Sequence, residues 1–201
     1  MHFSYKAQYF AIATIWGYYV LRPTGWLPWQ IGGYLSIDQS FEVATADQPF
    51  TKVPRSVLIY ACGTMGYHLS DWFNLQFVRE RASDFNEMSL HHLATFTCYF
   101  AAIWGNYLVI GGVVAYLHDI ADIFTTTARV LNSTHYEKSA LVCFIFLLAS
   151  WVWTRLYVLP QILYRVLTDP FPESMLKFQR FNGVQLGILQ LLHVYWFILL
   201  V

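Results

Sequence analysis

Long apolar runs recur along the chain and predict an all-α protein with about six membrane-spanning helices. A helix needs about 20 apolar residues to cross the hydrocarbon core of a bilayer, so the first, third and sixth runs are marginal when taken singly. Polar side chains that face the interior of a helix bundle would make such spans look short. The runs cover residues 9–21, 55–77, 90–104, 107–130, 140–163 and 184–201.

The connection between the first two runs, residues 22–54, is the longest and is rich in residues that interrupt helices. It also carries three aromatic residues of the kind that favour the membrane–water interface. We therefore expect it to lie at the interface or to fold over one mouth of the bundle. The residues concerned are Pro23, Pro28, Pro49, Pro54, Gly32 and Gly33, with Trp26, Trp29 and Tyr34.

Composition agrees with a membrane protein of one domain, residues 1–201. Hydrophobic residues make up 57% of the chain and charged residues only 12%, against about a quarter charged in soluble domains. The 12 basic and 12 acidic residues cancel, and nothing resembles a basic face for nucleic acid. Cys62, Cys98 and Cys143 each lie in an apolar run, which argues against a disulfide framework or a zinc site. We find no removable signal peptide, so insertion is expected to use these helices.

Two polar clusters interrupt the apolar pattern. The first enters the third run and contains the adjacent pair His91 and His92; the second lies inside the fourth run and contains His118, Asp119 and Asp122. Ionisable groups are costly in hydrocarbon, so they normally face a bundle interior or a wet cavity and mark function.

Spacing predicts that the two clusters meet. Residues three and four apart share a helix face, so His118, Asp119 and Asp122 form part of one polar stripe. The turn near Gly105 forces the third and fourth runs to be antiparallel. His92 and His118 stand equally far along the chain from this turn, and at about 1.5 Å per residue both should lie roughly 20 Å from it.

Such a constellation suits acyl transfer. A carboxylate can hold a histidine in one tautomer and make it a better base or nucleophile. A lone membrane histidine more often only packs or bridges helices, but two adjacent histidines and a His–Asp pair at one depth favour a function. The chain lacks the additional histidines of a di-iron lipid hydroxylase, so no metal is predicted, although His and Asp are common ligands. No nucleophile elbow or phosphate loop is present.

Further polar residues in the runs carry weaker predictions. Arg155 is expected to neutralise an aspartate of the stripe or to meet an anionic group of the substrate. His68 and Asp71 share a face and are interpreted as a bridge between helices, and His193 fits a structural or a functional role equally well.

The polar motifs resemble those of the TLC-domain family, and within it the ceramide synthases. Asp84-Phe-x-x-Met88-x-x-His91-His92-x-x-Thr95 and Gly112-x-Val114-x-x-x-His118-Asp119-x-x-Asp122 are similar to the Lag motif in order and separation. Further similarities are Pro28-Trp29, Arg155-Leu-x-x-x-Pro160 and Leu189-Gln190-x-Leu192-His193-x-x-Trp196, so most of the chain is covered.

The resemblance implies a barrel-like bundle of about six membrane helices around a lipid cavity. It also implies an N-acyltransferase that moves a fatty acyl group from acyl-coenzyme A, its substrate, to the amine of a sphingoid base, with no further cofactor. His91 and His92 would lie at the reaction centre, one of them accepting the acyl group or deprotonating the amine. His118, Asp119 and Asp122 would polarise or orient them, and Arg155, Thr126 and His193 would bind substrate. The implied compartment is the endoplasmic reticulum, with another organelle membrane such as the mitochondrial inner membrane as the alternative.

Two departures from the family pattern keep another function open. The family usually has Glu at the position of Thr126 and Lys at that of Arg129. A catalytically silent structural or lipid-binding subunit of a larger membrane complex is therefore the alternative, and a regulator of membrane fluidity is a third. The expected partners are lipid substrates and the membrane; other membrane subunits or a second copy in a homodimer are further alternatives.

Overall fold

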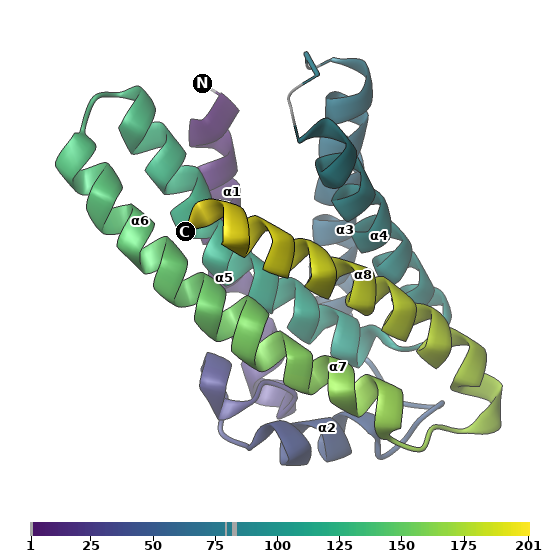
Figure 1. Ribbon diagram of the computed structural model, residues 1–201. Helices are drawn as coiled ribbons and strands as arrows, with labels where there is room; N and C mark the ends of the chain where they lie inside the picture. The colour runs from purple at the N-terminus through teal and green to yellow at the C-terminus, as the bar shows by residue number, and fades with distance from the viewer. Residues whose placement is uncertain (1, 79, 82–83) are drawn as a thin grey trace.

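Helices form nearly all of the regular structure in the computed structural model, which describes residues 2–78, 80–81 and 84–201 (Figure 1). Within these residues there is no strand, only an isolated bridge between Pro28 and Leu35. The α-helices are α1 (His2–Leu21), α2 (Ile37–Thr45), α3 (Arg55–Phe77), α4 (Phe85–Trp104), α5 (Leu108–Ser133), α6 (Glu137–Trp151), α7 (Leu159–Thr168) and α8 (Leu176–Leu200).

Each predicted run lies in a helical rod. The second run has the bounds of α3, and the fifth run becomes a continuous rod of α6, a π-helical segment η3 (Val152–Val158) and α7. The sixth run was predicted too short, because α8 already begins at Leu176. Its first turns carry Lys177, Gln179 and Arg180. These polar residues lower the local hydropathy, so the apolar pattern begins later than the helix does.

Among the residues that the structure describes, three stretches are long and apolar enough to cross a membrane: Leu108–Ser133, Glu137–Thr168 and Glu173–Leu200. The other rods, α1, α3 and α4, are outside this set, and α3 shows one reason. Its buried face carries Thr64, His68 and Asp71, whereas Phe73 and Phe77 on its outer face are exposed.

This distribution is the reverse of that in a soluble helix, which buries its apolar stripe. Helix α8 repeats it: His193 is fully buried, while Leu191 and Ile198 are about 70% exposed. Apolar side chains facing outward and polar ones facing inward need lipid as the surrounding solvent. The protein is therefore an integral membrane protein.

The helices pack as neighbours in a defined order (Figure 1). Helix α5 lies along α1 on one side and α6 on the other, and α4 lies between α3 and α8. Helix α7 packs on α8, and α1 also contacts α3. The α4–α5 turn is short: the backbone of Asn106 is left-handed (φ 52°), and the two helices run antiparallel as predicted.

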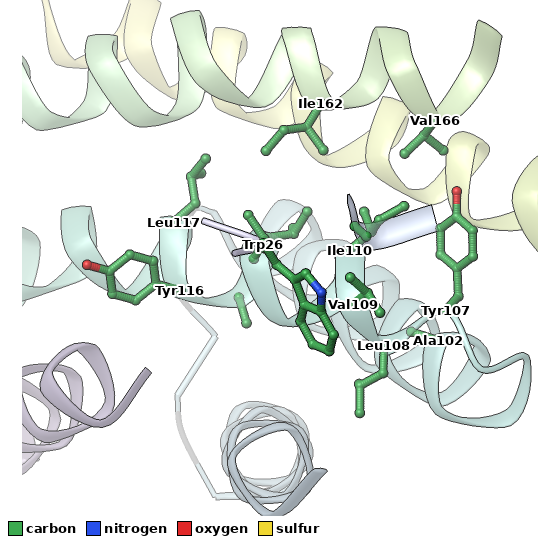
Figure 2. Packing of buried hydrophobic residues seen from close by; sticks show 14 of the residues in the cluster. Trp26, Ala102, Tyr107, Leu108, Val109, Ile110, Tyr116, Leu117, Ile162 and Val166 are labelled. Atoms are coloured by element: carbon green, nitrogen blue, oxygen red, sulfur yellow. The ribbon is translucent and has the colours of Figure 1, made fainter. Parts of the chain in front are cut away.

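The apolar core fills the end of the bundle near this turn. Leu108, Val109 and Ile110 of α5 pack there with Ile162 and Val166 of α7 (Figure 2).

The connection of residues 22–54 folds against this same end. Trp26 is 6% exposed and belongs to the core, whereas Trp29 and Tyr34 point outward. The side-chain amide of Asn106 donates to the carbonyls of Pro49 and Thr51 at 2.8 and 3.1 Å, which ties the connection to the α4–α5 turn. The connection was predicted to lie at the membrane interface or to fold over one mouth of the bundle. The structure shows the second placement, against the helix ends.

Helix α2 inside this connection begins with a capping box. The Ser36 hydroxyl accepts from the backbone N–H of Gln39, and the Gln39 side chain accepts from the backbone N–H of Ser36, both at 3.1 Å. The two bonds satisfy donors that a helix start leaves without partners.

Candidate functional site

Five buried histidines from four helices gather at the centre of the bundle: His68 of α3, His91 and His92 of α4, His118 of α5 and His193 of α8. The ring centroids of His118 and His193 are 4.8 Å apart, and those of His91 and His118 are 6.5 Å apart. His91 stands 6.1 Å from His193 and 5.5 Å from His92. The structure thus confirms that the two polar clusters meet at one depth.

One ring nitrogen of His118 is hydrogen-bonded, and the other has no hydrogen-bond partner among the described residues. Its Nδ1 lies 2.6 Å from the backbone carbonyl of Val114, one turn earlier in α5. A carbonyl only accepts, so Nδ1 carries the proton of this bond. Nε2 is buried and has no hydrogen-bond partner in the described part of the chain. An oriented ring with an available nitrogen is what a general base or nucleophile requires.

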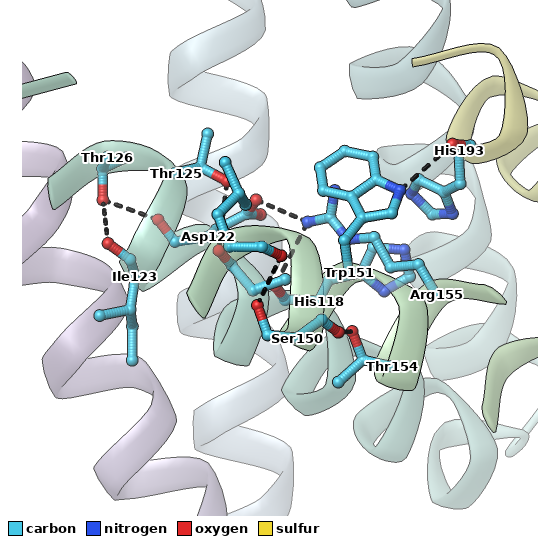
Figure 3. Close-up of polar contacts among 12 residues, drawn as sticks. His118, Asp122, Ile123, Thr125, Thr126, Ser150, Trp151, Thr154, Arg155 and His193 are labelled. Carbon is cyan, nitrogen blue, oxygen red and sulfur yellow. Dashed lines mark hydrogen bonds and ion pairs between the residues drawn. The ribbon is translucent and has the colours of Figure 1, made fainter. Parts of the chain in front are cut away.

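Asp122 pairs with Arg155 rather than with His118. Its Oδ1 accepts from Nη2 of Arg155 at 2.5 Å, and the same Nη2 lies 3.4 Å from the carbonyl of His118 (Figure 3). The guanidinium also lies over the ring of Trp151, 4.0 Å from the ring centroid. The ion pairing predicted for Arg155 is confirmed, and its role toward a substrate stays a prediction.

The backbone around Arg155 is π-helical, from Val152 to Val158. Pro160 follows after Leu159, and a proline ring clashes with the carbonyl four residues before it and donates no hydrogen bond. Widening the preceding turn relieves this conflict. The wider turn holds Thr154, Arg155 and Val158 in the interior, and π-helical turns are frequent at functional sites.

A carboxylate does lie beside a histidine of the site, but it comes from α3. Oδ2 of Asp71 is 3.2 Å from Nε2 of His92 and 2.7 Å from Nζ of Lys6. From the sequence, Asp71 and His68 were interpreted only as a bridge between helices, and Lys6 was not singled out. Their shared face on α3 was the available signal, but spacing within one helix could not show which neighbour that face meets.

Asp119 faces away from the other predicted residues. Its Oδ2 accepts from the hydroxyl of Tyr60 on α3 at 2.9 Å, and only 1% of the residue is exposed. Asp119 and Asp122 are three residues apart, yet Asp119 is absent from the linings of both cavities beside the histidines. The Asp119 carboxylate is thus bonded to Tyr60, and its predicted role in polarising or orienting His91 or His92 stays a prediction.

Thr126 and His193 differ in how they meet the site. The Thr126 hydroxyl donates to its own helix, to the carbonyls of Asp122 and Ile123 at 2.7 and 3.2 Å, and the residue lines a cavity (Figure 3). His193 is fully buried, and its backbone carbonyl accepts from the indole N–H of Trp151 at 3.2 Å. Neither ring nitrogen of His193 has a hydrogen-bond partner among the described residues.

Two cavities flank the histidines. The larger, of about 230 Å³, runs from the first turns of α1 and α4 and the last turns of α5 and α8 to the histidines. The smaller, of about 30 Å³, lies on the other side, towards the α4–α5 turn, and is mostly apolar. His68, His91 and Asp122 line both. The larger cavity is also lined by His92, Thr126 and Arg155, and the smaller by His118.

The arrangement offers nucleophiles, bases and the buried guanidinium of Arg155 in a mostly buried setting, where electrostatic interactions are stronger than in bulk water. Within residues 2–78, 80–81 and 84–201, no three His, Cys, Asp or Glu side chains converge in a way that could hold a metal ion. The chemistry that these residues offer themselves is proton transfer and nucleophilic attack.

Sequence comparisons identify the family of the chain and several relatives. The TLC domain matches residues 4–201. Mouse ceramide synthase 4 is 34% identical over 138 residues, which are 68% of this chain and 35% of the relative. ASC1-like protein 1 of rice is 28% identical over 167 residues, 77% of this chain and 52% of the relative. Ceramide synthase hyl-2 of Caenorhabditis elegans is 27% identical over 160 residues, 74% and 49% of the two chains. The chain thus spans about a third to a half of these relatives, and it belongs to the TLC-domain family.

Proposed function

We propose that this protein is a ceramide synthase-like N-acyltransferase that joins a fatty acyl group from acyl-coenzyme A to the amine of a sphingoid base. The amine nitrogen attacks the thioester carbonyl, a C–N bond forms and the C–S bond breaks. A histidine of the site takes the proton that the amine loses and passes it to the sulfur, so that coenzyme A leaves as the thiol. In a two-step route the acyl carbon first forms a C–N bond to a histidine ring as the C–S bond breaks, and the amine then displaces the ring as this C–N bond breaks.

The observation that carries the proposal is the meeting of His91, His92 and His118 between two cavities inside a membrane protein. His91 and His92 line the larger cavity, and His118 adds an oriented ring whose Nε2 has no hydrogen-bond partner in the structure as described. The substrates are lipids, and a reaction centre surrounded by hydrocarbon suits them. The relatives named as ceramide synthases support the same class of reaction.

The Arg155–Asp122 pair is assigned to the negative charge that develops on the thioester oxygen. The guanidinium is 3% exposed, faces the larger cavity and is fixed by Asp122 and Trp151. A cation held in place before the reaction stabilises such a charge without reorganisation. Thr126 lines the same cavity and is assigned to contacts with bound lipid.

The proposed architecture is a barrel-like bundle of six membrane helices. The order of contacts supports it, since α1, α5, the α6–α7 rod, α8, α4 and α3 each pack on the next, and α3 returns to α1. The family resemblance favours the endoplasmic reticulum, where the lipid substrates would be the partners.

The test is amide formation by the purified protein from acyl-coenzyme A and sphinganine, followed by mass spectrometry. His92→Asn and His118→Asn are expected to lose at least about 100-fold in rate, the usual contribution of a positioned acid or base. His135→Asn is the matched control, because His135 is exposed in the α5–α6 turn with φ 62°, a conformation that Asn adopts readily.

Two results contradict the proposal. Turnover that both cavity variants retain at the wild-type rate removes these histidines from the chemistry. No amide from a folded wild-type protein, under conditions in which a known ceramide synthase is active, favours instead a silent structural or lipid-binding subunit of a larger membrane complex.

A further inference from the structure

A third hollow lies between α1 and α3, beside the cavity of about 230 Å³, the larger of the two at the histidines. Its volume is about 410 Å³. Helix α1 contributes Tyr5 and Tyr9, four residues apart, and α3 contributes Gly63, Tyr67 and Ser70 at the same helical spacing. Residues at these intervals share a helix face, so two facing stripes, one on each helix, line this α1–α3 groove.

The groove leads from the surface to the histidines. Tyr5 and Gly63 at its rim are exposed, Tyr67 is half-buried, and Asp71 at its inner end is 6% exposed. Lys6, Tyr67 and Asp71 line both the groove and the larger cavity. Only side chains therefore separate the two spaces.

One aromatic ring belongs to this partition, that of Tyr67 of α3. On the groove side it stacks on Tyr9 of α1, with centroids 3.6 Å apart and ring planes 9° apart. Both hydroxyls are buried and without a hydrogen-bond partner among the described residues. Burying two hydroxyl donors without hydrogen-bond partners costs free energy. A ligand with hydroxyl groups of its own could accept hydrogen bonds from them.

The inner end of the groove already holds a primary ammonium on an alkyl chain, that of Lys6. Its Nζ lies 2.7 Å from Oδ2 of Asp71, and the same oxygen is 3.2 Å from Nε2 of His92. Lys6 thus marks a position where a buried carboxylate binds an alkylammonium within reach of a histidine of the proposed reaction centre.

We propose that the α1–α3 groove is the entrance and head-group site for the amine substrate, a long-chain amino alcohol, and that Asp71 binds its ammonium in place of Lys6. Tyr9 and Tyr67 part to admit the head group, and their hydroxyls bind its hydroxyls. The chemical class of this substrate rests on the proposed N-acyltransferase function. Asp71 is then a residue that selects a charged amine and places it beside His92.

The experiment measures equilibrium binding of radiolabelled sphinganine to the full-length protein in detergent, without acyl-coenzyme A. Two unlabelled competitors are compared: sphinganine itself and the matched long-chain diol that lacks the amino group. The wild type should prefer the amine by about tenfold or more, the range of a hydrogen bond to a charged group. Asp71→Asn should lose this preference, a readout that a merely structural role would leave in place.

A pair of glycine variants tests the route independently of Asp71. Gly63→Phe fills the groove and should weaken amine binding by about tenfold, the effect of a little over 1 kcal/mol. Gly66→Phe is the control, because Gly66 lies outside the groove lining and a Cβ there meets nothing within 4 Å. Lys6→Met removes the competing ammonium and should bind sphinganine more tightly than the wild type.

Several results overturn the inference: a wild type without preference for the amine, an Asp71→Asn variant that keeps the preference, or a Gly63→Phe variant that binds like Gly66→Phe. A Lys6→Met variant that loses the preference as Asp71→Asn does would show that Asp71 only anchors Lys6. Binding is measured without turnover, so the two proposals fail separately. If the variants bind the amine like the wild type while the protein still forms the amide, only the groove proposal is refuted. If binding depends on Asp71 but no amide forms, only the proposed transfer reaction is refuted.

Discussion

Replacing Asp122 by Ala removes the counter-charge of a buried guanidinium. Arg155 is 3% exposed, and its Nη2 donates to Asp122 at 2.5 Å. Breaking a buried ion pair from one side costs about 3–5 kcal/mol, because the remaining charge stays buried. The Asp122 side chain is 20% exposed and Arg155 also lies over Trp151, so we expect the lower end, about 3 kcal/mol. At about 2–4 °C per kcal/mol for a chain of this size, the midpoint of thermal unfolding should fall by roughly 6–12 °C.

The reverse replacement should cost less. In Arg155→Met the remaining carboxylate faces the larger cavity, where water can reach it, and the apolar side chain keeps the packing on Trp151. We expect about 1–2 kcal/mol for Arg155→Met. Adding Asp122→Ala to it should cost little more, since no buried cation is left behind.

The assay is thermal unfolding in detergent, followed by tryptophan fluorescence for the two single variants and the double variant. A coupling of about 2 kcal/mol between the two positions is the expected result, well above the few tenths found for independent sites. Asp38→Ala is the control: its pair with Arg165 is 3.7 Å long and the Asp38 side chain is 71% exposed, so less than about 1 kcal/mol should be lost. If the two single effects simply add, the pair does not hold Arg155 in place and the reasoning is refuted.

Other predictions follow from single contacts. Tyr60→Phe removes the hydroxyl that donates to the buried Asp119 at 2.9 Å and should destabilise the protein by about 1–3 kcal/mol; an unchanged unfolding midpoint contradicts this. Gly33→Ala places a Cβ 1.7 Å from the backbone carbonyl oxygen of Leu27, so we expect a large loss of stability, seen as faster proteolysis of the 22–54 connection. In Gly66→Ala the added Cβ meets nothing within 4 Å, so this variant should lose little stability. Equal rates of proteolysis of the Gly33→Ala and Gly66→Ala variants argue against the clash with Leu27.

Helical periodicity and one turn were sufficient to predict the meeting of the two polar clusters. The turn at Gly105 and Asn106 makes α4 and α5 antiparallel, and the constant rise of an α-helix then fixes the depth of His91 and His118. The position of the turn and the rise per residue are both local properties. They can be inferred from the sequence without knowledge of how the helices pack.

The partners of the charged groups could not be predicted in the same way. Asp71 reaches His92 because α3 turns one particular face towards α4, and that rotation is set by packing along both helices. Nδ1 of His118 donates to the carbonyl of Val114 instead of to a carboxylate, which leaves Asp122 for Arg155. Spacing within a helix limits which residues share a face, but it does not choose among the neighbours that the face meets.

The π-helical turn that carries Arg155 was likewise hidden. The sequence contains Pro160, a residue that can disturb a helix, but it does not specify the kind of disturbance. The π-helical turn from Val152 to Val158 shifts the register by part of a turn and holds Arg155 in the interior. A regular α-helix through these residues would give different side chains to the cavity.

In the proposed reaction an acyl chain enters the larger cavity and brings its thioester to His91 and His92. A cryo-electron microscopy map of the protein with a non-hydrolysable thioether analogue of acyl-coenzyme A tests this most directly. We predict density for the chain inside the cavity, with the sulfur end beside His91 and His92 and close to Arg155. Density for the chain only on the outer, lipid-facing surface, with the cavity beside the histidines empty, would contradict it.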